Sequence, residues 1–197
     1  MSTHDAYFSR LQAALQAEGE LLPRLIVDLD RLDHNIDQAV AFATQTGKAL
    51  RLVEKSLPSL QLLDYIARRA GTRRLMSFHQ PFLNLDAQHW PDADILLGKP
   101  MPVALAGRFY EQYSGPFDPQ RQLQWLIDTP ERLQQYLALA QRRGSRLNIN
   151  LELDVGLHRG GIPEGEAGAR MLGEILRTIE QYPQHLAFTG FMGYEPH

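Results

Sequence analysis

The stretch Asn148-Ile149-Asn150-Leu151-Glu152-Leu153-Asp154 decides between two parallel-sheet folds. Every second residue in it is polar, and Gln122-Leu123-Gln124-Trp125-Leu126-Ile127-Asp128 alternates nearly as regularly. Strands of an open doubly wound sheet are buried on both faces, so they read as continuous apolar runs. An alternating strand has one polar face, which lines a barrel interior when its apolar face meets the helices. The alternation therefore favours a barrel, with Asn150, Glu152 and Asp154 pointing into its interior.

Strand-like and helix-like segments alternate along the chain, with Gly and Pro between them. This rhythm predicts an α/β fold with a parallel sheet covered by helices. An antiparallel sheet with one solvated face is the alternative, and the intervening helices disfavour it. Strands are expected at residues 25–27, 50–56, 74–78, 94–97, 122–127, 148–155 and 186–192. Helices are expected at residues 30–46, capped by Asp30, and at 58–70, 103–113, 128–143 and 163–182.

Composition excludes several classes of function. The 197 residues suffice for one domain, and 44% hydrophobic with 22% charged residues is typical of a globular protein. A net charge of −3 leaves no basic surface for nucleic acid or for a membrane. The chain has no cysteine, which excludes disulfides, thiolate metal sites and a cysteine nucleophile. The N-terminus has no signal-peptide core and no segment can span a bilayer, so we expect a cytoplasmic protein.

Lys55 is the first candidate for chemistry. It ends the run Leu50-Arg51-Leu52-Val53-Glu54-Lys55, and in an α/β barrel the carboxyl ends of the strands carry the active site. Lysine is scarce here, with three residues against seventeen arginines. An amine at this place suits Schiff-base chemistry with a carbonyl of a substrate or of pyridoxal phosphate. The alternative is a rim lysine that reaches water. Lys99 also ends a strand and is the rival amine.

Two further stretches follow predicted strands. Residues 154–161 are rich in glycine, which lets the backbone approach a ligand closely, and they contain His158 and Arg159. Arg159 could donate to an anionic ligand oxygen, or form a structural salt bridge to an acid of the preceding strand. Residues 189–197 contain Tyr194, a candidate proton donor or flat contact for a ring. A tyrosine at the edge of the core is the alternative.

Together these stretches resemble the N-terminal barrel of fold-type III pyridoxal phosphate enzymes. The nearest branch is that of D-threonine aldolase and D-serine dehydratase, related to alanine racemase. The resemblance implies a parallel (β/α)8 TIM-type barrel, incomplete here with about six barrel strands. It covers roughly residues 23–197 and rests on Val27-Asp28-Leu29-Asp30-Arg31-Leu32, Lys55-Ser56, Met76-Ser77-Phe78-His79, Leu96-Leu97-Gly98-Lys99-Pro100, Asp154 to Gly161 and Gly190 to His197.

The resemblance implies a role for each of three residues. Lys55 would hold pyridoxal phosphate as a Schiff base and move the proton at the substrate α-carbon. Arg159 would lie near the phenolic oxygen of the cofactor, and Tyr194 beside its ring or the substrate. The implied protein is a lyase, a homodimer that cleaves D-threonine-like or dehydrates and deaminates D-serine-like substrates. The family's histidines around the lysine are missing from Val53-Glu54-Lys55-Ser56-Leu57-Pro58, which indicates a divergent sub-branch.

Other functions stay open at this point. The protein could be an alanine-type racemase, a pyridoxal phosphate carrier without turnover, a cofactor-free aldolase that uses Lys55 or Lys99, or an inactive remnant. We expect residues 1–197 to form a single partial barrel domain. The last barrel strands, their phosphate-binding loops and a β-rich domain with the family's divalent-metal site would lie outside it. The spacing of the histidines predicts no metal site within this chain.

Overall fold

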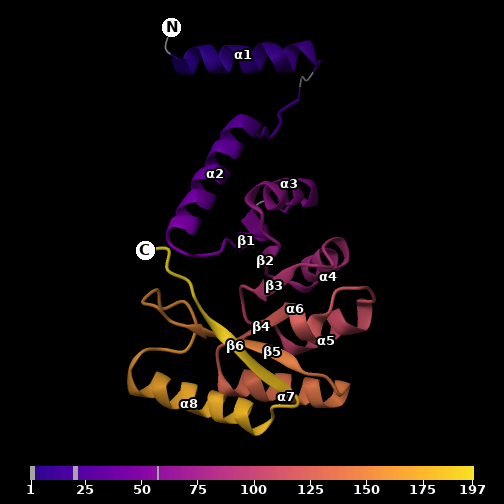
Figure 1. Ribbon diagram of the computed structural model, residues 1–197, viewed down its shortest axis with the longest axis vertical. Helices are drawn as coiled ribbons and strands as arrows, with labels where there is room; N and C mark the ends of the chain where they lie inside the picture. Colours follow the sequence, from indigo (N-terminus) through magenta and orange to yellow (C-terminus); the bar gives the residue numbers. More distant parts are fainter. Residues whose placement is uncertain (1–2, 20–21, 57) are drawn as a thin grey trace. The chain divides into compact units, whose positions relative to one another are not determined.

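The computed structural model describes residues 3–19, 22–56 and 58–197 of the chain. These residues fall into two compact units, Met1–Asn35 and Ile36–His197. The first contains α1 (Thr3–Ala17) and the start of α2 (Leu29–Gln45). The second holds the parallel sheet and the remaining helices (Figure 1).

The first unit corrects two expectations. The strand expected at residues 25–27 is wrong, because residues 23–28 have no regular structure and no described strand pairs with them. Asp28, rather than Asp30, caps α2: its Oδ1 accepts a hydrogen bond from the Arg31 N–H at 3.1 Å. The Tyr7 hydroxyl donates to Asp28 Oδ2 at 2.7 Å. These hydrogen bonds lower the pKa of Asp28, that from Tyr7 most.

The sheet of the second unit has six strands in sequential order, and every neighbouring pair is parallel. No described strand pairs with the outer edge of either end strand. This order confirms the parallel α/β sheet and is that of successive units of a (β/α) barrel. The strands are β1 (Leu52–Val53), β2 (Arg74–Ser77), β3 (Asp94–Leu97), β4 (Leu123–Ile127), β5 (Leu147–Leu153) and β6 (Leu186–Gly193).

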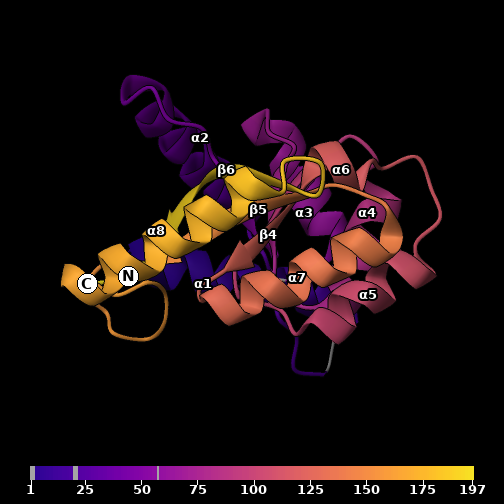
Figure 2. The ribbon, with the colours of Figure 1, turned by 90° about the horizontal axis from the view of Figure 1, so that it is seen from below.

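The helices that follow β1, apart from the short one at residues 119–122, pack along one side of the sheet (Figures 1 and 2). Right-handed crossovers between sequential parallel strands place all connecting helices on one face, which becomes the outside of a barrel. Sequence reasoning missed α1, the helix at Gln80–His89 (α4) and the short helix at Pro119–Gln122 (α6). The connecting elements are the 3₁₀ turn η1 (Glu54–Ser56), α3 (Leu60–Ala70), α4 (Gln80–His89), α5 (Val103–Gln112), α6 (Pro119–Gln122), α7 (Pro130–Arg143) and α8 (Gly165–Gln181).

Local sequence explains where α7 begins and ends. The Thr129 hydroxyl accepts a hydrogen bond from the Arg132 N–H at 3.1 Å, and Pro130 occupies the first helical position. Gly144 ends the helix with φ 61°, a left-handed conformation that glycine adopts without steric cost. The helix expected at 128–143 is therefore confirmed, with its first residue at Pro130.

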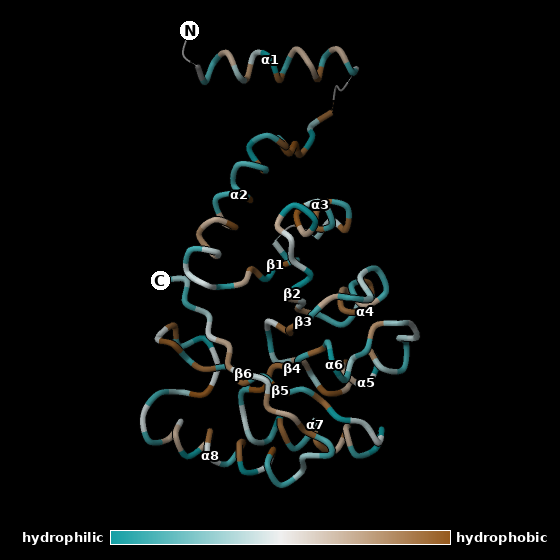
Figure 3. Tube along the Cα trace, viewed as in Figure 1, coloured by the Kyte–Doolittle hydropathy of each residue, from teal (hydrophilic) through white to brown (hydrophobic). Residues whose placement is uncertain are grey.

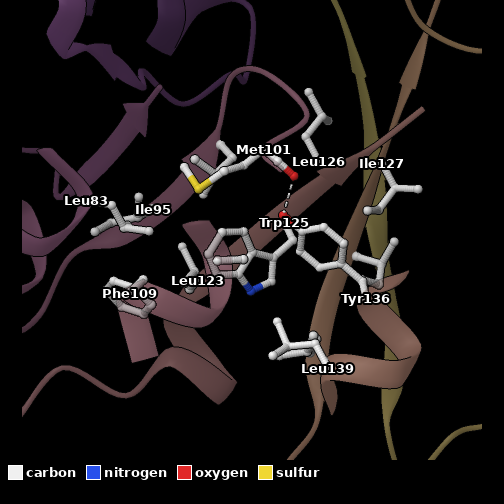
Figure 4. Packing of buried hydrophobic residues seen from close by; sticks show 14 of the residues in the cluster. Leu83, Ile95, Met101, Phe109, Leu123, Trp125, Leu126, Ile127, Tyr136 and Leu139 are labelled. Carbon is white, nitrogen blue, oxygen red and sulfur yellow. Dashed lines mark hydrogen bonds between the residues drawn. The ribbon is translucent and has the colours of Figure 1, made fainter. Parts of the chain in front are cut away.

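The core fills the space between the sheet and the helices. Figure 4 shows Trp125 of β4 packed between Phe109 of α5 and Tyr136 of α7, all completely buried. The Tyr136 hydroxyl donates to the Met101 carbonyl at 2.9 Å, so this buried polar group is paired. Helices α7 and α8 alternate between hydrophilic and hydrophobic segments along the trace, as expected of helices with one buried face (Figure 3).

The other face of the sheet is polar, as the alternation in β4 and β5 predicts. Asn148, Asn150 and Glu152 are all buried there. Asp94 Oδ1, at the start of β3, accepts hydrogen bonds from Arg51 Nη2 at 2.9 Å and Gln124 Nε2 at 2.7 Å. This network joins three segments at the amino ends of the strands, which leaves the carboxyl ends for the candidate site.

Candidate active site

Lys55 stands immediately beyond the carboxyl end of β1. The strand is shorter than expected, since it ends at Val53 and the chain turns through η1, which carries Lys55. Lys55 Nζ lies 4.1 Å from the centroid of the Phe78 ring, in the residue that follows β2. A cation over an aromatic face is stabilised by the ring quadrupole. The amine is therefore held at the predicted end of the strand.

Gly98, after β3, makes room for the Phe78 ring. A Cβ atom at this position would lie 2.5 Å from Phe78 Cε1 and 2.8 Å from Met76 Cγ. Real Cβ atoms do not approach other atoms so closely, so any larger residue would displace the ring. The three strand ends β1, β2 and β3 thus form one small structure, in which Gly98 admits the ring and the ring contacts Lys55.

The loop after β5 folds back onto its own strand. Asp154 Oδ1 accepts hydrogen bonds from the N–H groups of Gly156 at 3.1 Å and His158 at 2.9 Å, and Asp154 Oδ2 lies 2.9 Å from His158 Nδ1. The backbone and side-chain hydrogen bonds of His158 lower the pKa of Asp154. His158 itself has φ 55°. A Cβ at Gly161 (φ 98°) would come within 2.7 Å of the Asp154 nitrogen, so glycine is required there.

This loop brings Arg159 to Tyr194. The guanidinium Cζ lies 4.1 Å from the centroid of the Tyr194 ring, which follows β6 and is 46% exposed. Arg159 Nη2 also lies 3.8 Å from Glu152 Oε1, so the ion pair weighed for Arg159 involves Glu152. Asp154, the other partner considered, pairs with His158 instead. Two residues predicted to act in one site are therefore adjacent in the structure.

Glu152 is a buried acid at the centre of this group. Burial raises its pKa, and the positive charges of Lys99 and Arg159 act in the opposite direction. Lys99, which follows β3, is the positive charge that lowers the pKa of Glu152 most. Asn150 comes two residues before Glu152 in β5, on the same face of the strand. Its Oδ1 is buried and has no hydrogen-bond partner in the described part of the chain. The polar face thus offers a cation, an acid and an unpaired amide oxygen.

The two halves of the predicted site lie at opposite ends of the sheet. Lys55 follows β1, whereas Arg159 and Tyr194 follow β5 and β6, which are the far end of the strand order. Within residues 3–19, 22–56 and 58–197, no hydrogen bond, ion pair or ring contact joins Lys55 to Arg159 or Tyr194. Closure of a sequential parallel sheet into a barrel brings its two end strands toward each other.

Sequence reasoning missed an acid pair next to Lys55. Glu54 and Asp86 are 2% and 1% exposed, and both face the helix side of the sheet. Asp86 lies on α4, between the fully buried Leu83 and Ala87. In the sequence, Asp86 lies among apolar residues at helical spacing in the segment 80–89, and this pattern could have predicted a buried acid.

Lys55 supplies an amine at one end of the sheet, and Arg159 stacked on Tyr194 supplies a guanidinium and an exposed aromatic ring at the other. By their chemistry, an amine could bind the aldehyde of pyridoxal phosphate, and a guanidinium could bind an oxygen of its ring. The described residues contain no cluster of three or more His, Cys, Asp or Glu side chains that could hold a metal ion.

Among the helices that the structure describes, none is both long and apolar enough to cross a membrane.

Comparisons with known proteins agree with this fold. The family model of the alanine racemase N-terminal domain matches residues 27–197. No curated protein matches the chain. Solved structures that resemble it include D-threo-3-hydroxyaspartate dehydratase from Delftia sp. HT23, with TM-score 0.67 and 20% identity over 85% of this chain and 41% of that one. D-threonine aldolase from Filomicrobium marinum is similar with a TM-score of 0.66 and 18% identity, over 86% of this chain and 43% of that one.

An alanine racemase from Oenococcus oeni is a third such structure, with TM-score 0.62 and 16% identity over 83% of this chain and 45% of that one. The chain thus spans less than half the length of each of these three proteins. At these identities the likeness establishes the fold, and it does not choose among a dehydratase, an aldolase and a racemase.

Proposed function

Because the chain belongs to the family of the alanine racemase N-terminal domain, we propose that it forms part of a pyridoxal phosphate lyase acting on D-amino acids. The family is that of fold-type III pyridoxal phosphate enzymes, which include racemases, dehydratases and aldolases. The observation that carries the proposal is the lysine at the carboxyl end of β1, the place where barrels of this type carry out chemistry.

Lys55 is the residue proposed to bind the cofactor covalently through Nζ. Its position on a turn held against β2, with Phe78 below the amine, restricts where Nζ can reach. The same amine is also the group proposed to move the proton at the substrate α-carbon. Lys99 is the rival, and its electrostatic interaction with Glu152 supports a role within the polar interior instead.

Arg159 and Tyr194 are proposed to contact the cofactor ring. The guanidinium carries a permanent charge and can donate to the phenolic oxygen of the ring. Glu152, 3.8 Å from Arg159, restrains its orientation. Tyr194 offers its exposed ring or hydroxyl to the cofactor or the substrate. Pyridoxal phosphate, when bound, withdraws electrons from the α-carbon, and the protein selects the bond that breaks.

The specific reaction is proposed from the branch that the sequence resembles. Aldol cleavage breaks the Cα–Cβ bond of a β-hydroxy amino acid and releases an aldehyde. Dehydration removes the α-proton and the β-hydroxyl, and the product hydrolyses to a 2-oxo acid and ammonia. A racemase is the second candidate, favoured by the family match. It needs an acid or base on each face of the cofactor, and Tyr194, which lies beside Arg159, is the residue proposed for the second face.

The test is an absorbance titration of the chain with pyridoxal phosphate, followed by borohydride reduction and peptide mapping. We expect a yellow adduct and a reduced, cofactor-modified Lys55. Lys55→Ala should abolish the adduct, whereas Lys99→Ala, the matched control, should retain it. An adduct that maps to Lys99, or an adduct that persists in Lys55→Ala, would refute the proposed role. D-threonine, D-serine and D-alanine added to the adduct then distinguish aldehyde, 2-oxo acid and L-isomer as products.

A further inference from the structure

Two carboxyl groups lie together behind the turn that carries Lys55. Glu54 comes from η1 and Asp86 from α4, and both are nearly completely buried. A buried acid is costly unless it is paired or neutral. No ion pair within the described chain involves either of them. The hollow beside them is lined by apolar side chains, those of Pro58, Leu60, Leu63, Phe82 and Leu85.

The hydrogen bonds around the pair are consistent with one proton shared between the two carboxyl groups. The Ser77 hydroxyl donates to Glu54 Oε1 at 2.5 Å. Asp86 Oδ2 is buried and has no hydrogen-bond partner among the described residues. An ionised carboxylate can only accept hydrogen bonds, whereas a protonated one has an O–H to donate. A proton on Asp86 would therefore give the unpaired oxygen a function, because it could donate to Glu54.

The charges on the surrounding elements do not neutralise the pair. Burial, a hydrogen bond to Glu54 and the charge of Glu54 raise the pKa of Asp86 to about 9, and the Ser77 hydroxyl acts against them. The other ionisable groups on the adjoining elements have their own contacts. They include Asp64 on α3 with Arg68 and Arg73, Arg69 on α3 with Asp37, Arg74 on β2 with Asp94, His79 before α4 with Phe82, His89 in α4 with Trp90, and Lys55 on η1 with Phe78.

The pair is linked to Lys55 by two consecutive contacts. Glu54 is bound to Ser77 on the helix side of the sheet, and the next residue, Lys55, contacts Phe78, the next residue of the neighbouring segment. Displacement of Glu54 would rotate the short turn and move Nζ off the ring. We propose that Glu54 and Asp86 share one proton and, through the turn, act as positioning residues for Lys55.

The proposal has a consequence for pH. Loss of the shared proton leaves two negative charges side by side in apolar surroundings, which repel each other and disfavour the closed packing of η1 on α4. In alkaline solution, Nζ of Lys55 would then no longer be held over the Phe78 ring. The link to cofactor chemistry rests on the function proposed for Lys55, whereas the shared proton itself does not.

The first measurement detects the proton without any cofactor. Infrared difference spectra of the chain between about pH 6 and about pH 10 should show the band of a protonated carboxyl. This band should disappear as the pH rises through about 9. Asp86→Asn should remove this band. Asp64→Asn, the same change on the adjoining helix, should keep it. Absence of the band from the wild-type chain at neutral pH would overturn the proposal, whether or not pyridoxal phosphate binds.

The second measurement follows the position of Lys55. Competitive acetylation compares the labelling of Lys55 with that of Lys99 across the same pH range. The wild-type ratio should show an additional inflection where the infrared band is lost, and Glu54→Gln and Asp86→Asn should each lose this inflection. Equal profiles in wild type and both folded variants would show that the pair does not position Lys55. Since acetylation needs no cofactor, this result is independent of the cofactor-mapping test.

Discussion

Replacement of Asp86 by asparagine should flatten the dependence of stability on pH. Asp86 has a folded pKa of about 9 against an ordinary value of 3.8, so between these values the folded state holds a proton that the unfolded state has lost. The free energy of unfolding therefore falls as pH rises through this interval. The stabilisation is complete below the unfolded value and is lost as pH approaches the folded one.

The magnitude follows from one proton. Each pH unit inside the interval lowers the free energy of unfolding by about 1.4 kcal/mol. From about pH 5 to about pH 8, well inside the limits, the loss attributable to Asp86 is about 4 kcal/mol. Glu54→Gln should end the decline at a lower pH, because it removes the charge that helps Asp86 keep its proton.

Urea unfolding at a series of pH values measures this effect as a difference between proteins. Other groups titrate in the same range, so the quantity of interest is the wild-type slope minus that of Asp86→Asn. Asp64→Asn serves as the control and should keep the wild-type slope. If Asp86→Asn and the wild type have parallel profiles between about pH 5 and about pH 8, Asp86 is ionised in the folded protein and the reasoning fails.

Four further substitutions test the packing of the core and the candidate site. Gly98→Ala should destabilise the protein by about 1–3 kcal/mol in thermal or urea unfolding, because the new methyl group meets the Phe78 ring. Gly107→Ala in α5 is the control and should stabilise the protein by about 0.5–1 kcal/mol, because alanine favours a helix interior and its methyl group has room there. Arg159→Ala should cost at most about 1 kcal/mol of stability yet weaken retention of pyridoxal phosphate in a dialysis assay, and an unchanged cofactor affinity would contradict the role given to the guanidinium. Tyr136→Phe should cost about 1 kcal/mol in urea unfolding, and a neutral result would mean that its buried hydroxyl contributes nothing net.

The sequence predicted the repeating part of the fold. Thr129, Pro130 and Gly144 define α7 through local chemistry, and the alternation in β4 and β5 depends on which face each residue occupies. The strand expected at residues 25–27 failed because a strand needs a partner, which periodicity does not supply. Helix α4 was missed because its first turn contains Gln80-Pro81 without a side-chain cap.

The candidate site was predicted only in part. Lys55, Arg159 and Tyr194 were found because each follows a strand, and the contact of Arg159 with Tyr194 agrees with a shared site. Their functions stay predictions. The pair of Glu54 with Asp86 depends on α4 packing against η1, which joins residues far apart in the sequence. No local pattern in the chain encodes such a contact.

The sequential order of the strands has a consequence for how the chain folds. Every strand after β1 pairs with the strand that precedes it in the sequence, so the pairing partner of each new strand is synthesised before that strand leaves the ribosome. Pairing with the preceding strand keeps the sequence separation of each strand pair to one βα unit, which limits the loop-closure entropy of that pairing. The sheet can therefore grow vectorially during translation, one βα unit at a time, with the most recent strand always serving as the template for the next.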